Sequence, residues 1–134
     1  MKAAAPGPTA AASLLAAGLL AATGAALAAA SAHPWPLLVS LLIAPVLEET
    51  VFRAGLHDRL LDGGLAPWLA NLMTAMAFCA AHLLLVGIHW QTALVWLPAL
   101  LIGAAYNRWR RVRICIALHM AMNLTWLAAT QGMA

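Results

Sequence analysis

Charged residues are scarce in this chain of 134 residues, at 8% of the total, whereas soluble domains carry about 25%. So few charges cannot cover a surface that faces water, and hydrophobic residues make up 65% of the chain. The composition therefore excludes an ordinary soluble domain and requires a lipid bilayer. The net charge of +3 comes from basic residues in short loops between apolar segments, so it does not indicate nucleic-acid binding.

Cysteine is nearly absent as well, and both cysteines, Cys79 and Cys115, lie inside apolar runs. This placement argues against a disulfide framework. Each cysteine precedes a histidine, His82 or His119, by about one helical turn, which leaves a metal site as a minor alternative.

The nucleophiles of other membrane proteases are also missing. The only serines are Ser13, Ser31 and Ser40, and none lies in a G-x-S-x-G setting. Asp58 and Asp62 share one turn, so a paired aspartyl mechanism has no second residue within the membrane.

Five apolar segments approach the roughly 20 residues that a membrane-spanning helix needs. We expect them at residues 9–32, 36–56, 67–87, 90–106 and 114–130. Prolines around Trp35 and an Asp62-Gly63-Gly64 turn separate the first three. The sequence thus predicts an all-α fold, a polytopic transmembrane helix bundle of four to five spans.

The first apolar segment has two interpretations. It is rich in alanine and glycine, and Ala29 to Ala32 resembles a signal-peptide cleavage site. We therefore divide the chain into an N-terminal segment, residues 1–35, that is a transmembrane helix or signal-like, and a core at residues 36–134.

Lysine and arginine predict the orientation, since they gather on the cytoplasmic side of membrane proteins. They precede the first span and follow the second and fourth, at positions that share one side of the membrane. This side is expected to be cytoplasmic, and the C-terminus is expected outside. A chain this short and alanine-rich suggests the inner membrane of a bacterium.

Several spans carry polar side chains where insertion is costly, at least ~2.5–3.5 kcal/mol for a charge at the bilayer centre. Glu48, Glu49 and Arg53 lie in the second span. Glu49 and Arg53 are one turn apart and can pair, which leaves Glu48 without that partner. The alternative is a purely structural set, with Arg53 reaching to the cytoplasmic interface.

The third and fifth predicted spans add His82 and the pair His119 and Asn123, which are four residues apart and share a helix face. Each alone fits a hydrogen-bonded structural residue. Together with Glu48 they supply the carboxylate and imidazoles that water activation requires. His33, His57 and His89 fall in loops or at span ends, and we expect them to be solvated.

Three short motifs occur in order on successive apolar segments. Glu48 to Arg53 reads E-E-x-x-x-R, Phe78 to His82 reads F-x-x-x-H, and His119 to Asn123 reads H-x-x-x-N. The ordered trio resembles the CPBP family (CAAX proteases and bacteriocin-processing enzymes, Abi) of intramembrane proteases. The resemblance covers residues 36–130, although larger family members have about eight spans.

This resemblance implies an intramembrane glutamic endopeptidase. Glu48 would be the general base that activates water, assisted by His82, and His119 and Asn123 would stabilise the oxyanion. Glu49, Arg53 and Phe78 would give structural support. No cofactor is favoured; the alternative is a divalent metal such as zinc, with Glu48, His82 and His119 as ligands.

The expected partners are the lipid bilayer and a membrane-protein or lipidated peptide substrate, with no nucleic acid. A bacteriocin leader or a C-terminal sorting tail would be a suitable substrate. A homo-oligomer or a partner subunit would complete so small a scaffold. The alternative function is a non-catalytic membrane immunity or adaptor protein that retains the protease fold.

Overall fold

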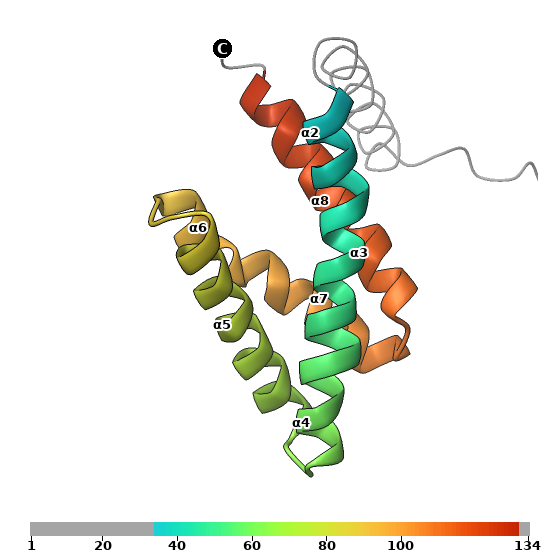
Figure 1. Ribbon diagram of the computed structural model, residues 1–134. Helices are drawn as coiled ribbons and strands as arrows, with labels where there is room; N and C mark the ends of the chain where they lie inside the picture. Colours follow the sequence, from blue (N-terminus) through green and yellow to red (C-terminus); the bar gives the residue numbers. More distant parts are fainter. Residues whose placement is uncertain (1–33, 132–134) are drawn as a thin grey trace, which may run out of the picture.

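The regular elements of the computed structural model, which describes residues 34–131, are all helices. Within these residues the predicted all-α helical membrane bundle is confirmed. The predicted apolar segment at residues 9–32 lies outside the described residues. Figure 1 shows a bundle built around one long helix, against which the helices at residues 67–85 and 112–131 pack.

The long helix is continuous from Pro34 to Asp62. It consists of α2 (Pro34–Leu38), η1 (Val39–Ile43), α3 (Ala44–Glu49), η2 (Thr50–His57) and α4 (Asp58–Asp62), in which the two η segments are wider π-helical turns. Pro45 lies just after η1 and has no amide hydrogen to donate, so a widened turn before it is physically reasonable. The helix extends beyond both ends of the predicted span at residues 36–56.

Two further helices run beside it. Helix α5 (Pro67–Leu85) starts at a proline, which suits the first turn of a helix, and follows a turn in which Gly64 has a φ of 84°. Helix α8 (Val112–Gln131) ends the described part of the chain. Within residues 34–131, three helical stretches are long and apolar enough to cross a membrane: Pro34–Asp62, Pro67–Leu85 and Val112–Thr130.

The span predicted at residues 90–106 is wrong as a single helix. The chain instead forms a short helix, α6 (Trp90–Leu94), and α7 (Trp96–Trp109), with a break at Val95 and a proline at position 98. Helix α7 has 14 residues, about 21 Å at 1.5 Å per residue, which is less than the ~30 Å of a bilayer core. It runs obliquely from α6 to the start of α8 and packs against α5 and α8 (Figure 1).

The hairpin between the long helix and α5 brings Glu48 and His82 to a similar depth. Glu48 precedes Asp62 by 14 residues, and His82 follows Pro67 by 15 residues. The two residues are therefore almost the same number of residues away from the turn that joins their helices, which favours a similar depth.

The bundle interior is unusually polar. Its largest fully buried side chains include Arg53, His57 and Glu49. Two small apolar clusters accompany them, one around Phe78 and one around Tyr106. Large apolar side chains face outward, in agreement with a bilayer as the solvent; they include Leu47, Val51, Leu84, Leu85, Ile88 and Leu101.

Gly103 allows α7 to approach α5 closely. A Cβ atom at this position would overlap Oδ1 of Asn71 and would lie 3.0 Å from Nη1 of Arg53. We therefore predict that Gly103→Ala destabilises the bundle by about 1–3 kcal/mol through overpacking. Gly55→Ala is the matched control, because its Cβ would meet only the Thr50 carbonyl oxygen, at an ordinary 3.6 Å. Thermal unfolding in detergent measures both; equal melting temperatures for the two variants would contradict the prediction.

Candidate active site

The site begins with a buried ion pair on the long helix. Nε of Arg53 lies 3.0 Å from Oε2 of Glu49, and both side chains are almost completely buried. Nη2 of Arg53 donates to the carbonyl oxygen of Ala99 on α7, at 2.9 Å. The expected pairing of Glu49 with Arg53 is therefore present, and Arg53 does not reach to the interface but ties the long helix to α7.

The second oxygen of Glu49 holds His119. Nδ1 of His119 lies 2.8 Å from Oε1 of Glu49. An ionised carboxylate only accepts hydrogen bonds, so Nδ1 carries the proton in this contact. The opposite ring nitrogen, Nε2, is then directed to Oε2 of Glu48, at 3.6 Å. One histidine thus lies between two adjacent carboxylates, with its orientation fixed by the buried one.

Glu48 differs from Glu49 in its exposure. Its side chain is 28% exposed, whereas that of Glu49 is 1% exposed. Consecutive residues of an α-helix point about 100° apart, so Glu49 faces into the bundle while Glu48 faces partly out of it. A partly exposed carboxylate beside an imidazole is able to bind and deprotonate water.

Asn123 lies one turn beyond His119 on α8. Its Nδ2 donates to the carbonyl oxygen of Ser40, at 2.8 Å, where the π-helical turn η1 widens the long helix. An amide nitrogen carries two hydrogens, so one is left for a ligand. This bond fixes the direction of the Asn123 side chain and links α8 to the long helix.

His82 approaches from α5. Its Nδ1 lies 3.1 Å from the carbonyl oxygen of Phe78, one turn earlier. A carbonyl accepts, so Nδ1 is the donor and Nε2 keeps a lone pair. The Phe78 ring packs against His82, with centroids 4.3 Å apart, and against His119, with centroids 5.9 Å apart. Phe78 therefore sets the spacing between the two histidines.

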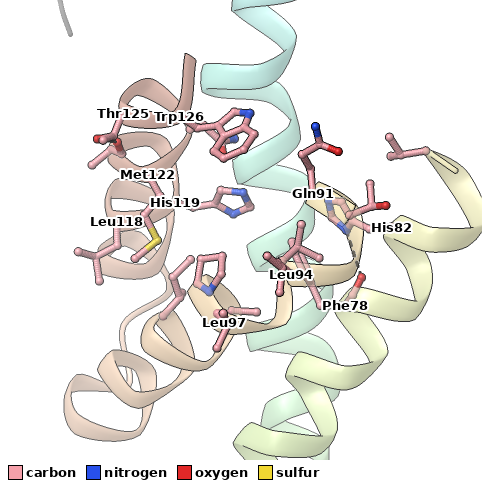
Figure 2. A pocket seen from close by; sticks show the side chains of 18 of the residues that line it. Phe78, His82, Gln91, Leu94, Leu97, Leu118, His119, Met122, Thr125 and Trp126 are labelled. Carbon is pink, nitrogen blue, oxygen red and sulfur yellow. Dashed lines mark hydrogen bonds between the residues drawn. The ribbon is translucent and has the colours of Figure 1, made fainter. Parts of the chain in front are cut away.

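A cavity of about 810 Å³ opens between α5, α6, α7 and α8. Its lining is mainly apolar and includes Phe78, Trp90, Leu94, Leu97, Met122 and Trp126. His82 and His119 enter it from opposite sides, as Figure 2 shows, and Asn123 also lines it. The structure thus brings His82, His119 and Asn123 to one cavity, with Glu48 next to His119.

Among residues 34–131, no group of three or more His, Cys, Asp or Glu side chains is placed to hold a metal ion. The set Glu48, His82 and His119 does not form such a group. The thiols of Cys79 and Cys115 lie near the carbonyl oxygens of Thr92 and Ile102, at 3.6 and 3.8 Å.

His57 corrects the sequence analysis. It was expected to be solvated, but it is fully buried, and its Nε2 lies 3.0 Å from Oδ1 of Asn107 on α7. The four-residue spacing of Glu49, Arg53 and His57 places the three residues on one helical face. This spacing is the sequence pattern that could have predicted the burial of His57. Because the predicted span ended at residue 56, the sequence pattern placed His57 outside the helix.

A second set of polar contacts involves Asp58, which follows His57 on the long helix. The Tyr106 hydroxyl donates to Oδ2 of Asp58, at 2.7 Å, and Nη2 of Arg110 lies 2.9 Å from Oδ1 of Asp58. Burial, followed by this hydrogen bond, raises the pKa of Tyr106 to about 12. Tyr106 therefore stays protonated and acts as a fixed donor between α7 and α4.

Comparison with known proteins identifies the family. A sequence profile of the Rce1-like type II CAAX prenyl endopeptidases matches residues 30–125, which is more than half of the chain. The chain belongs to this family. No curated protein and no solved structure matches it.

Membership in the Rce1-like family supports a membrane endopeptidase at the level of the family, and the three membrane-spanning candidates indicate a multi-pass protein. The matched region contains all three motifs, from Glu48 to Asn123.

We predict that Arg53→Ala lowers the amount of folded protein. The change leaves the buried Glu49 carboxylate without its charged partner and with only the hydrogen bond from His119, and breaking a buried pair on one side costs about 3–5 kcal/mol. Arg59→Ala is the control, because Arg59 is exposed on the same helix. Immunoblots of membrane fractions measure both variants; wild-type amounts of Arg53→Ala would contradict the structural role of the pair.

Proposed function

We propose that the chain is an intramembrane glutamic endopeptidase in which Glu48 activates the attacking water. The observation that carries this proposal is that His119, anchored by Glu49, directs its second nitrogen to Glu48 at the edge of an apolar cavity. The family supports peptide-bond hydrolysis in the membrane. The roles of individual residues are inferred from their geometry.

In the first step, water binds between Glu48 and His82. It donates one hydrogen to the Glu48 carboxylate and the other to Nε2 of His82, whose Nδ1 is occupied by the Phe78 carbonyl. Glu48 takes the proton as the oxygen attacks the substrate carbonyl carbon. The C–O bond forms while the carbonyl π electrons move to oxygen, which gives a tetrahedral oxyanion.

The oxyanion then requires hydrogen-bond donors that stabilise its negative charge. His119 offers Nε2–H to the oxyanion when both of its nitrogens are protonated, and the bond from Nδ1–H to Glu49 fixes the direction of the ring. Asn123 offers the Nδ2 hydrogen that is not bonded to Ser40. Such donors are effective because the surrounding site excludes water. The intermediate collapses when Glu48 returns its proton to the leaving amine.

We further propose a membrane-anchored or lipidated protein as the substrate, for example one with an apolar C-terminal sorting tail. The mainly apolar lining of the cavity suits such a segment. Trp90 and Trp126 meet edge to face, with centroids 6.0 Å apart, and both line the cavity. The family description, a CAAX prenyl endopeptidase, also points to processing near a C-terminus. We place the protein in a bacterial inner membrane, alone, as a homo-oligomer or with a partner subunit.

Glu48→Gln tests the base. The amide keeps the shape of the side chain but cannot accept a proton, so cleavage is expected to fall at least about a hundredfold at unchanged protein levels. The measurement compares the protein termini of membrane and secreted fractions from cells that express the wild type or the variant. Asp62→Asn, an exposed carboxylate change on the same helix, is the control. Near-normal cleavage by Glu48→Gln would contradict the assignment of Glu48 as the general base. If no terminus differs even between the wild type and cells without the protein, an adaptor or immunity role is the better account.

Asn123→Ala tests the oxyanion donor. Loss of one such donor is expected to lower kcat by about 10²–10³-fold with little change in KM. Thr125→Ala is the matched control, because Thr125 also lines the cavity but bonds its own helix at Ala121. Kinetics with a fluorogenic peptide in detergent micelles separate the two constants. A change in KM alone would show that Asn123 binds substrate and does not stabilise the transition state.

A further inference from the structure

The exposed arginines of residues 34–131 all lie at one end of the bundle, which we call the arginine end. They are Arg59, Arg108, Arg110, Arg111 and Arg113. The first lies in α4, and the other four surround the turn from α7 to α8. A salt bridge of 2.9 Å from Nη2 of Arg110 to Oδ1 of Asp58 holds this turn beside α4. Because Lys and Arg gather on the cytoplasmic side of membrane proteins, we expect the arginine end to face the cytoplasm.

Helix α8 leads away from the arginine end along the long helix. Its His119 bonds to Glu49, and its Asn123, one turn later, bonds to the carbonyl oxygen of Ser40. Asp58, Glu49 and Ser40 lie progressively earlier in the long helix, and therefore progressively further from α4. The polar groups of the proposed active site are thus in the part of the bundle that is remote from the arginines.

Helix α5 places His82 in the same part of the bundle. This helix starts at Pro67, shortly after α4 ends, and its 19 residues measure about 28 Å, close to the ~30 Å of a bilayer core. His82 lies 15 residues after Pro67 and three residues before Leu85. Measured along the helix, it is about 22 Å from the start and only about 5 Å from the other end. His82 is therefore in the half of the membrane opposite the arginine end.

The cavity occupies this half as well. On α5 its lining begins at Phe78, and on α8 it extends from Leu118 to Ala129. Figure 1 shows α6, which also lines it, at the end of α5 that is furthest from α4. Trp90 and Trp126 line the cavity and are 65% and 49% exposed. Since tryptophan is enriched at membrane–water interfaces, this pair is placed as expected for the interface opposite the arginines.

We propose that the site opens to the outer, non-cytoplasmic side of the membrane and that its substrates are exported proteins, cut in the outer half of the bilayer. The attacking water supports this assignment, because the bilayer core holds no water and His82 is much nearer to the outer end of α5 than to the inner one. The substrate class rests on the proposed function, whereas the side to which the cavity opens does not.

An exported protein that is still attached to the membrane fits this depth. Its apolar segment joins the exported domain at the outer end of the segment, so a peptide bond at this junction meets the site directly. The tail of a lipidated cytoplasmic protein meets the membrane at the arginine end, about 22 Å from His82 along α5. The geometry therefore favours the exported protein over the cytoplasmic one.

Cysteine labelling in bacterial spheroplasts tests the side of the membrane. Gln91→Cys places a thiol in the lining of the cavity, which Gln91 enters from α6 (Figure 2). Arg59→Cys places one at the arginine end, and both positions are exposed. The unchanged chain measures the background, since Cys79 and Cys115 are buried. With a membrane-impermeant maleimide, we expect labelling of Gln91→Cys in intact spheroplasts and of Arg59→Cys only after lysis.

Three results of the labelling would overturn the proposal. They are labelling of Gln91→Cys only after lysis, no labelling of Gln91→Cys in either preparation, and labelling of Arg59→Cys in intact spheroplasts. None of these results depends on whether the protein cleaves peptides.

The protein termini that differ between cells with the wild type and cells with Glu48→Gln test the substrate class. We expect them on proteins that carry an export signal, at the junction of an apolar segment with the exported domain. New N-termini would identify a leader as the part removed, and new C-termini would identify a tail; both agree with the proposal. Termini on cytoplasmic proteins would overturn it and leave the peptidase function intact. If no terminus differs, the proposed function fails, and the labelling still decides the side.

Discussion

The Glu49 carboxylate, bound at once by Arg53 and His119, is the interaction on which the arrangement of the site depends. A carboxylate without partners inside a bilayer is very costly, so its two oxygens strongly favour positions where both partners are in place. Arg53 bonds to a carbonyl oxygen on α7, and His119, which binds the second oxygen of Glu49, lies on α8. One buried charge thereby joins three helices and leaves the adjacent Glu48 free to act on water.

The bilayer explains why polar contacts have this importance. Apolar side chains gain no hydrophobic free energy when they move from lipid into the bundle, because lipid is as apolar as they are. The interior accordingly keeps only small apolar clusters, while Arg53, His57 and Glu49 are among its largest fully buried side chains. A stripe of polar residues from His119 to Asn107 takes the place of a large hydrophobic core, and the structure is held by directional bonds.

Much of the fold and of the site could be predicted from the sequence, and the predictions that were wrong have physical causes. The low charge predicted a membrane bundle, and the Glu49–Arg53 spacing predicted their pairing. Hydropathy alone placed one long span at residues 90–106, but it did not detect the break at Val95, a residue that lines the cavity. The burial of His57 was missed because polar residues near a predicted span end look solvated. The bond between His119 and Glu49 joins residues 70 positions apart, and no local pattern specifies it.

The most direct test of the central contact is a distance measurement in lipid bilayers by solid-state NMR, between the His119 Nδ1 nitrogen and the labelled side-chain carboxyl carbons of Glu49 and Glu48. The account predicts that Nδ1 is protonated and lies within hydrogen-bonding range of the Glu49 carboxylate, with the Glu48 carboxylate nearer to Nε2. An unprotonated Nδ1, or an Nδ1 nearer to Glu48 than to Glu49, would contradict the account, because Glu49 would then not direct His119 to Glu48.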